Sequence, residues 1–371
     1  MKQTKILIAP LNWGLGHAAR CIPIIKELKN LGAEVIIAAD GRALELLQKE
    51  FPELKCIRLP GYEIRYHEKG SLTLKLLLQL PRLIASVIKE HKQLKKIITV
   101  EKIDAVISDN RYGLYSKKIK SVFITHQTGI KLPKYIAWLE AFVNSINHYF
   151  ISKFDACWIP DFEGTDNLSG ELSHNYSLPK NAIFIGPLSR FTYREEKKKY
   201  DLLILLSGPE PQRTLLEKLL IKQLFQTENE LIPRRPDQKL KVFLVRGIAE
   251  GSNQPINISE NFTRVDYLLT EELNNAILSS DVIISRPGYT TIMDLAILGS
   301  KAIFIPTPGQ TEQEYLADYF KRRGIYYSEG QQEFNIKRAM EQIKNYTVPS
   351  LEYDKRYRKR LSNWMEDLCN A

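Results

Sequence analysis

Residues 282–318 read VIISRPGYTTIMDLAILGSKAIFIPTPGQTEQEYLAD and alternate twice between a short apolar run and a helical pattern. The runs Val282–Ser285 and Ala302–Pro306 lack polar alternation, which is typical of parallel strands buried on both faces. A turn containing Gly and Pro follows each run, and the helical patterns Thr290–Leu298 and Glu312–Arg323 follow the turns. This order of strands and helices predicts a doubly wound α/β sheet.

The same alternation of apolar runs and helical patterns extends over the rest of the chain. We expect further strands at Lys5–Leu11, Glu34–Ala39, Leu54–Leu59, Ala105–Ser108, Ser121–Thr125, Ala156–Ile159, Ala182–Ile185, Leu202–Leu206, Lys241–Val245 and Arg264–Val265. Amphipathic patterns such as Ala18–Leu31 and Gln212–Phe225 separate them. The sequence therefore predicts two α/β units in series.

Length and local composition indicate where the two units meet. At about 100–200 residues per domain, 371 residues predict two domains. The boundary is expected within Gly186–Tyr200, where an apolar strand gives way to a charged polar segment. We therefore place the first domain at residues 1–188 and the second at residues 200–345. Residues 346–371 are expected to contain a last helix that packs back on the first domain.

Composition and charge exclude several classes of protein. With 44% hydrophobic and 26% charged residues, the chain resembles neither a disordered protein nor a collagen. Its four cysteines stand far apart without a CxxC pair, so we expect neither a disulfide framework nor a metal site built on them. The net charge of +10 favours an acidic partner, which is a nucleic acid, an anionic lipid or a phosphorylated small molecule.

Targeting signals are not apparent in the sequence. The N-terminal residues run directly into the first expected strand, without the longer apolar stretch of a signal peptide. No apolar stretch approaches the ~20 residues that span a bilayer. These features predict a cytoplasmic protein.

A glycine loop, NWGLGH at residues 12–17, follows the first expected strand and opens a helix. Gly14 and Gly16 allow backbone N–H groups to approach a ligand, and the helix N-terminus favours an anion. His17 then stands where it would be closest to that ligand. Two alternatives remain open: a dinucleotide-binding fingerprint formed with Asp40, or an ordinary turn in which His17 is a surface cap.

Asp109 ends the buried strand of the segment DAVISDNR, residues 104–111. Because the carboxyl ends of parallel strands lie at one edge of a sheet, we expect Asp109 to share a crevice with His17. A carboxylate there holds an imidazole in one tautomer and stabilises the imidazolium that forms when it accepts a proton. The alternative is a turn or N-cap carboxylate. His126, at the end of the next strand, is expected to line the same crevice.

The segment SRPGYTTIMD, residues 285–294, joins a buried strand to a helix in the second half. Gly288, Thr290, Thr291 and the N–H groups of this helix start suit a diphosphate. Asp294 lies one turn inside the helix, where it is placed to accept two hydrogen bonds from a ribose diol. The segment therefore predicts a nucleotide site.

Two further loops are expected at the same sheet edge. Ser207 and Gly208 follow the first strand of the second half, and Gln310 lies in the loop that opens the helix after residue 310. We expect Arg246 and Arg286 to add positive charge beside the diphosphate. Three ordinary turns are the alternative to a nucleotide pocket.

Residues 282–318 and the loop Gly14–His17 resemble those of a known family. The first segment resembles the donor-binding signature of GT-B glycosyltransferases, most closely the family-28 group. That group contains the peptidoglycan lipid-intermediate N-acetylglucosaminyltransferase and the plastid galactolipid synthases. The resemblance implies a GT-B fold, in which two Rossmann-like domains face each other across a cleft. The first domain would bind the acceptor and the second a nucleotide sugar.

The resemblance also implies roles for individual residues. Asp294 matches the acid that binds the nucleotide ribose, and Gln313 and Glu314 match the pair that binds the donor sugar's hydroxyls. The turn after the first strand of the second half matches the second diphosphate loop. The pair of His17 and Asp109 is similar to the base dyad of small-molecule UDP-glycosyltransferases, which share the fold.

The chain departs from the family-28 pattern at three places. Asn12 and Trp13 replace two glycines of the first loop, the turn Ser207–Pro211 has one glycine and two prolines, and Glu314 replaces a glutamine. The donor sugar therefore need not be N-acetylglucosamine. The chain contains no Asp-x-Asp triplet, the motif with which the other common transferase fold holds a metal, so a metal-independent reaction is expected.

Residues 70–98 combine a strongly apolar segment, GSLTLKLLLQL, with an amphipathic helix. One face of that helix carries Leu83, Ile84, Val87, Ile88, Leu94, Ile97 and Ile98, and the other carries Arg82, Lys89, Lys92 and Lys96. One interpretation is an edge that contacts an anionic membrane and so suits a lipid-linked acceptor. The other is a core helix with a solvated basic face. No nucleic-acid-binding motif is present, so no nucleic-acid partner is expected.

Together these features predict an inverting glycosyltransferase of the hexosyltransferase type. It would move a sugar from a nucleotide sugar, expected to be UDP-linked, to a hydroxyl acceptor that is lipid-linked or part of a cell-envelope glycan. We expect no metal and no cofactor besides the donor, a monomer or weak dimer, and a place at the inner face of the membrane. The alternatives are a nucleotide-sugar hydrolase or epimerase, an NAD-dependent oxidoreductase, and a catalytically silent binding protein.

Overall fold

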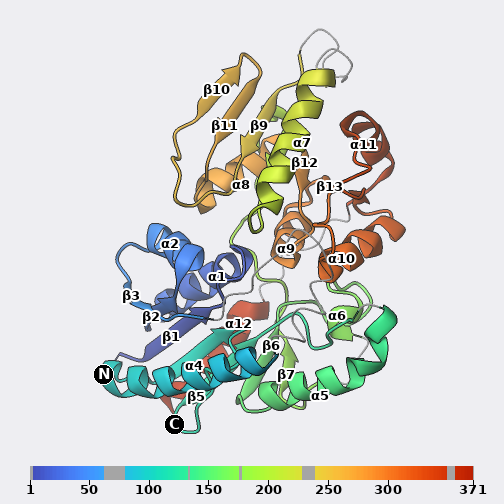
Figure 1. Ribbon diagram of the computed structural model, residues 1–371. Helices are drawn as coiled ribbons and strands as arrows, with labels where there is room; N and C mark the ends of the chain where they lie inside the picture. The colour runs from blue at the N-terminus through green and yellow to red at the C-terminus, as the bar shows by residue number, and fades with distance from the viewer. Residues whose placement is uncertain are drawn as a thin grey trace. The chain divides into compact units, whose positions relative to one another are not determined.

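The computed structural model describes residues 3–61, 80–132, 134–174, 178–227, 239–348 and 356–370. The described residues form two compact units (Figure 1). The first unit comprises the described residues up to 190 together with residues 356–370. The second comprises residues 191–227 and 239–348. The apolar segment at residues 70–79 lies outside the described residues.

The first unit is built on a parallel sheet in the order β3-β2-β1-β4-β5-β6-β7. Its strands are β1 (Lys5–Pro10), β2 (Glu34–Ala39), β3 (Lys55–Arg58), β4 (Ala105–Asp109), β5 (Lys120–Ile124), β6 (Ala156–Ile159) and β7 (Ala182–Phe184). Its helices are α1 (Gly16–Asn30), α2 (Gly41–Glu50), α4 (Leu80–Glu101), the 3-10 helix η1 (Lys134–Leu139), α5 (Glu140–Ile151), α6 (Glu171–His174) and α12 (Arg356–Cys369).

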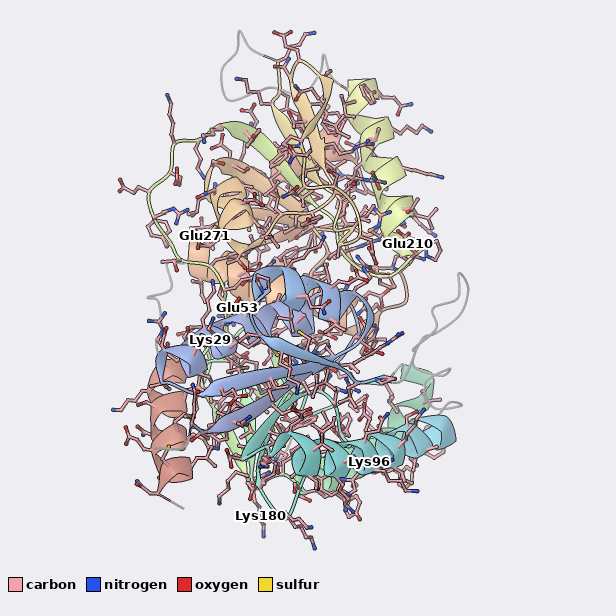
Figure 2. The ribbon with its side chains drawn as sticks, turned by 90° about the vertical axis from the view of Figure 1, so that its left-hand side faces the viewer. Lys29, Glu53, Lys96, Lys180, Glu210 and Glu271 are labelled. Atoms are coloured by element: carbon pink, nitrogen blue, oxygen red, sulfur yellow. The ribbon has the colours of Figure 1, made fainter. Side chains whose placement is uncertain are left out.

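Both faces of this sheet are buried, as its apolar strands predict. Ile6 and Ile8 pack in one core with α1, α2 and α12, while Leu7 and Ala9 pack in another core that includes Leu94 of α4. The ring centroids of Trp158 and Trp364 lie 5.6 Å apart and join β6 to α12. At the surface, an ion pair between Lys29 and Glu53 ties the end of α1 to the chain that leaves α2 (Figure 2).

The second unit has a sheet in the order β10-β11-β9-β8-β12-β13-β14. Its strands are β8 (Tyr200–Leu205), β9 (Val242–Val245), β10 (Ile256–Ser259), β11 (Phe262–Val265), β12 (Ser280–Ser285), β13 (Ala302–Phe304) and β14 (Tyr327–Ser328). Its helices are α7 (Gln212–Thr227), α8 (Thr270–Leu278), α9 (Tyr289–Leu298), α10 (Thr311–Arg322), α11 (Ile336–Gln342) and η2 (Ile343–Asn345). All paired strands are parallel except β10, which runs antiparallel to β11.

The structure confirms the two doubly wound α/β units and every strand that the sequence predicts. It adds two edge strands that the sequence does not predict. The side chains of β10 are all exposed, so they carry no apolar run, and β14 has only two residues.

Strand order determines where ligands bind in such sheets. In open α/β sheets, ligands bind at the carboxyl ends of the strands, at the point where successive connections leave in opposite directions. In the first unit this point lies between β1 and β4, where Pro10 is paired with Asp109. In the second unit it lies between β8 and β12, where Leu205 is paired with Ser285. The predicted site loops of each unit therefore begin side by side.

The buried face of α4 differs from the predicted one. Val87, Glu90 and Leu94 are buried, whereas Ile84 and Ile88 are 40% and 53% exposed. Glu90 pairs with the buried Arg111, so a charged side chain takes a place on the buried face where the sequence pattern predicts apolar ones. The lysines of the predicted basic face, including Lys96, are exposed (Figure 2). No helix among the described residues is long and apolar enough to cross a membrane.

Candidate active site

The loop between β1 and α1 holds a glycine that no other residue replaces easily. Gly14 has φ +75°, a conformation that strains an L side chain, and a Cβ added there would meet nothing within 4 Å. The loop therefore keeps open space above the sheet edge. α1 begins at Gly16, and Leu15 before it provides no side-chain cap.

His17 and Asp109 are brought into direct contact at this edge. His17 Nδ1 lies 2.7 Å from Asp109 Oδ1, and Asp109 is fully buried at the end of β4. Burial opposes ionisation of this carboxyl, but the charges of Arg20 and His17 prevail and lower its pKa to about 2. Asp109 is therefore a carboxylate at neutral pH, and the geometry fits a hydrogen bond donated by His17 Nδ1.

Arg20 is the residue of this cluster that the sequence analysis did not identify. It is 1% exposed and lies one turn after His17 on α1. Its Nε donates to Asp109 Oδ2 and its Nη2 to Asp109 Oδ1, so the guanidinium grips the carboxylate in a fork. The available signal was a charged residue on the apolar side of an otherwise amphipathic helix, one turn from a candidate base.

His126 joins the same cluster from the loop after β5. It is 6% exposed, and Arg20 Nη1 lies 2.9 Å from its Nδ1. The predicted neighbourhood of His126, His17 and Asp109 is therefore present. Cys21 is also buried beside Asp109, and burial first, then the carboxylate, raises the pKa of its thiol well above the ordinary value.

Asp40, the acid of the alternative dinucleotide fingerprint, is engaged elsewhere in the first unit. Its Oδ2 accepts a hydrogen bond of 3.0 Å from the backbone N–H of Gly61. The carboxylate thus fixes the chain that leaves β3.

The first loop of the second unit contains Ser207 and Gly208 and packs closely against the loop after β9. Gly208 has φ +105°, and a Cβ added at Gly247 would lie 2.2 Å from the carbonyl oxygen of Leu206. The loop after β9 therefore approaches the loop after β8 as closely as backbone allows. Glycine at position 247 is what makes that contact sterically feasible.

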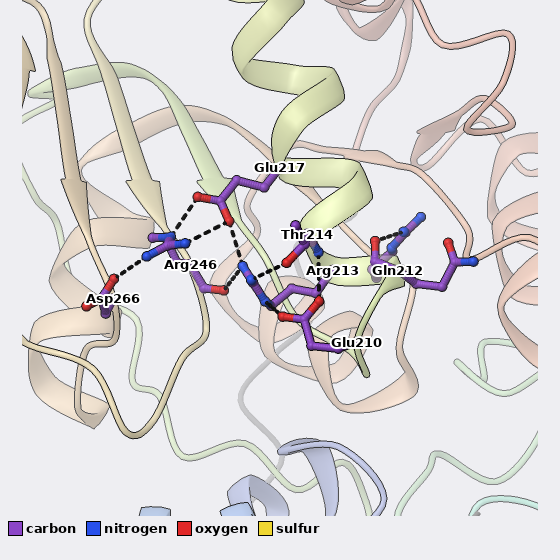
Figure 3. Close-up of polar contacts among 8 residues, drawn as sticks. Glu210, Gln212, Arg213, Thr214, Glu217, Arg246 and Asp266 are labelled. Atoms are coloured by element: carbon purple, nitrogen blue, oxygen red, sulfur yellow. Dashed lines mark hydrogen bonds and ion pairs between the residues drawn. The ribbon is translucent and has the colours of Figure 1, made fainter. Parts of the chain in front are cut away.

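A chain of alternating charges connects these loops to α7 (Figure 3). Arg246 Nε donates to Glu217 Oε1 at 2.6 Å, and Arg246 Nη1 donates to Asp266 Oδ1 at 2.8 Å. Arg213 bridges Glu217 and Glu210 with distances of 2.7 Å and 2.6 Å. Hydrogen bonding to Glu217, the largest of several causes, raises the pKa of Arg246.

These contacts give Arg246 a structural role. Its guanidinium is paired with the carboxylates of Glu217 and Asp266, which offset its charge. It holds the loops after β9 and β11 against the start of α7. Its contact with a diphosphate stays a prediction.

Arg286 is buried at the carboxyl end of β12 and has a different environment. Its Nη1 donates to the carbonyl oxygens of Ile305 and Pro306. Its Nη2 donates to the carbonyl oxygen of Gln212 and to the side-chain oxygen Oε1 of Gln331. Each of these partners among the described residues is neutral. Burial lowers the pKa of Arg286 to about 10, so the side chain keeps its positive charge at neutral pH. This charge lies beside the predicted diphosphate loops, although the contacts it makes are to the protein itself.

The start of α9 agrees with an anion site. Gly288 is the N-cap residue and has no side-chain cap, and a Cβ added there would meet only Thr291 Oγ1, at 3.9 Å. Thr290 and Thr291 lie in the first turn, and Asp294 lies further along α9 with 7% exposure. An uncapped N-terminus next to a buried cation favours negative charge.

Gln310, Gln313 and Glu314 organise the loop before α10. Gln310 is the N-cap residue, Gln313 Oε1 accepts from the N–H of Thr307 at 2.8 Å, and Glu314 Oε1 accepts from the N–H of Gly309 at 2.8 Å. Gln313 and Glu314, the predicted sugar-binding residues, therefore each use one side-chain oxygen to accept a hydrogen bond from the backbone of the loop before α10. Among the described residues, no three His, Cys, Asp or Glu side chains are grouped as a metal site requires.

Two family models match parts of this chain. Residues 212–368 match the family model described as the glycosyltransferase family 28 C-terminal domain, and residues 4–124 match the model described as glycosyl transferase family 1. The chain is a glycosyltransferase with the GT-B fold, and its second half is similar to family 28. The first match covers most of the second unit and also α12 of the first unit, and the second match covers the part of the first unit that contains His17.

Relatives of this glycosyltransferase cover most of its length. An uncharacterized glycosyltransferase of Methanosarcina acetivorans is 26% identical over 341 residues, which are 86% of this chain and 82% of that protein. The UDP-N-acetylglucosamine–N-acetylmuramyl-(pentapeptide) pyrophosphoryl-undecaprenol N-acetylglucosamine transferase of Haemophilus influenzae is 24% identical over 359 residues, covering 95% and 92%.

Solved structures place the glycosyltransferase in the same fold. The glycotransferase of kitacinnamycin has a TM-score of 0.60 at 13% identity, covering 100% of this chain and 95% of the other. MurG of Acinetobacter baumannii has a TM-score of 0.55 at 14% identity, covering 99% and 100%. At these identities the likeness concerns the fold alone.

Proposed function

We propose that this glycosyltransferase transfers a sugar from a nucleotide sugar to an acceptor hydroxyl with inversion, using His17 as the general base. The observation that carries the proposal is the 2.7 Å contact between His17 Nδ1 and the ionised Asp109. His17 Nε2 takes the hydroxyl proton while the acceptor oxygen attacks the anomeric carbon. The bond from that carbon to the diphosphate breaks, and its electron pair leaves with the diphosphate. A single displacement of this kind inverts the anomeric centre.

The second unit supplies the proposed stabilisation of the leaving diphosphate. The uncapped start of α9 and the charge of Arg286 favour an anion at this sheet edge. We propose that these groups act without a metal and that Asp294 binds the ribose, as the family resemblance implies. UDP is the proposed nucleotide because the Haemophilus influenzae relative is named for a UDP-linked donor.

The acceptor is proposed to be lipid-linked, at an anionic membrane surface on the cytoplasmic side. Two features support this. The Haemophilus influenzae relative is named for a pyrophosphoryl-undecaprenol acceptor. In this chain, α4 exposes Ile84 and Ile88 close to the exposed Lys89 and Lys92, an arrangement that suits a lipid interface.

A thermal-shift series tests the donor proposal. UDP, GDP, dTDP, CMP and NAD are compared, each with and without EDTA. A ligand at a hundredfold excess over its Kd stabilises the folded state by about 2.7 kcal/mol. We expect UDP to raise Tm equally with and without EDTA. Loss of the shift in EDTA would overturn metal independence, and a shift with NAD alone would favour the oxidoreductase.

A product analysis tests the reaction class. The anomeric configuration of the product is read by NMR from a UDP-sugar of known configuration and a hydroxyl acceptor. Inversion in a glycoside product is expected. A retained configuration would contradict the single displacement, and release of free sugar with no glycoside would favour the hydrolase alternative.

A further inference from the structure

Two imidazoles meet one guanidinium in the His17 cluster. Arg20 Nη1 lies 2.9 Å from His126 Nδ1, and Arg20 Nη2 lies 3.0 Å from His17 Nδ1. The other donors of Arg20 grip the two oxygens of Asp109. A guanidinium has N–H donors and no acceptor, so every group it contacts must either accept a hydrogen bond or share an acceptor with it.

This chemistry determines the tautomer of His126. A hydrogen bond from Arg20 Nη1 requires a lone pair on His126 Nδ1. The neutral ring must then carry its proton on Nε2. A proton on Nδ1 would place two N–H groups head to head, and in the doubly protonated ring it would also place two positive charges 2.9 Å apart in a buried site.

The opposite tautomer follows for His17. Its Nδ1 lies 2.7 Å from Asp109 Oδ1, which is ionised. Two lone pairs at that distance repel, so Nδ1 carries the proton and Nε2 carries the lone pair. Arg20 Nη2 and His17 Nδ1 are close because both donate to the same oxygen, Asp109 Oδ1.

We propose that Arg20 is a positioning residue that fixes the tautomer of His126 directly and that of His17 through its fork on Asp109, and thereby decides which imidazole is the base. Only His17 keeps a lone pair at Nε2. His126 Nδ1 is occupied by Arg20, and its Nε2 is protonated, so this ring cannot take a proton while Arg20 is in place. The statement about the base rests on the proposed function, whereas the two tautomers do not.

Arg20 also keeps the dyad ionised. Among the described residues, the charged and titratable groups that contact Asp109 include Arg20, His17 and Cys21 of α1, and His126 reaches it through Arg20. Without the guanidinium, burial would raise the pKa of Asp109 and favour its neutral form, which holds His17 less firmly.

The experiment uses the full chain with ¹⁵N-labelled histidine. Long-range ¹H–¹⁵N correlations distinguish the two tautomers of each ring. In the native protein we expect His126 as the Nε2–H form and His17 as the Nδ1–H form. In Arg20→Lys, which keeps a charge but loses the planar fork, we expect His126 to show both forms. We also expect kcat to fall, by at most the loss of about 10⁴-fold that a wrong tautomer causes, with donor KM unchanged.

Arg111→Lys is the matched control because Arg111 is equally buried in the same unit but is paired with Glu90. It should leave both tautomers unchanged. An Nδ1–H form of His126 in the native protein, or unchanged tautomers and kcat in Arg20→Lys, would overturn the proposal. Native-like turnover in His17→Ala, with the expected tautomers present, would instead overturn the base assignment alone.

Discussion

At the scale of single residues, His17 and Asp294 should separate catalysis from donor binding. His17→Ala removes the proposed base, and a positioned base contributes about 10²–10⁴-fold, so kcat should fall by that factor while the donor Kd changes little. Asp294→Ala should raise the donor KM with a smaller effect on kcat, because ribose contacts are equal in the ground and transition states. Steady-state kinetics and calorimetric titration with UDP measure both. Loss of UDP binding in His17→Ala would make His17 a phosphate contact.

Asp109 should also link the stability of the protein to pH. Its pKa in the folded protein is about 2, below the ordinary value of 3.8. The ionised carboxylate therefore stabilises the folded state fully above about pH 4, and this stabilisation is lost as the pH falls toward 2. A shift of that size corresponds to about 2–3 kcal/mol. Urea unfolding between pH 2 and 6 should therefore show a smaller loss of stability on acidification in Asp109→Asn than in the native protein. Asp166→Asn, at an exposed site, should keep the native profile. Identical profiles for all three proteins would contradict the prediction.

The sequence predicts three residues of the His17 cluster but not the fourth, Arg20. His17, Asp109 and His126 each stand at the carboxyl end of an apolar strand, and the topology of a parallel sheet alone brings such positions together. Arg20 lies within a helix, where arginine is most often solvated, and its partner is 89 residues away in the sequence. Its role therefore becomes visible only when the sheet places Asp109 beneath α1.

At the scale of elements, Glu217 of α7 contacts Arg246 in the loop after β9 and also Arg213 of α7, which in turn contacts Glu210 in the loop after β8 (Figure 3). Glu217→Gln removes the carboxylate shared by Arg213 and Arg246, and breaking a buried ion pair costs about 3–5 kcal/mol. We expect a lower Tm and a raised donor KM, with little change in kcat. Lys218→Gln, exposed on the same helix, is the control and should change neither. An unaltered KM in Glu217→Gln would mean that this network does not position the donor loops.

Periodicity predicts elements well where burial determines the pattern. It fails for β10, whose side chains are exposed, and for part of α4, where buried Glu90 takes a position that the apolar pattern does not mark. Arg246 is a third such case. Periodicity does not reveal the two carboxylates that pair with it, those of Glu217 and Asp266, which lie 29 residues before it and 20 residues after it in the sequence.

At the scale of the whole molecule, the net charge of +10 attracts the protein to anionic surfaces. The question is whether α4 is the part of the protein that contacts such a surface. Each Lys near such a surface contributes about 1 kcal/mol, and this attraction is screened by salt. Changing Lys89, Lys92 and Lys96 to Glu should weaken binding to vesicles of anionic lipid in a sedimentation assay at low salt, while the UDP-induced thermal shift is retained.

The control for that prediction carries the same change in net charge at another place. Lys117, Lys118 and Lys120 are exposed in the same unit, between β4 and the start of β5, and their replacement by Glu gives the same total charge. If the whole-molecule charge governs binding, both triple variants should lose vesicle affinity equally. If α4 is the contact edge, the α4 variant should lose far more, because its lysines neighbour the exposed Ile84 and Ile88, whose insertion requires that edge to face the lipid. Equal vesicle binding by the native protein and the α4 variant would return the helix to the second interpretation, a core helix with a solvated basic face.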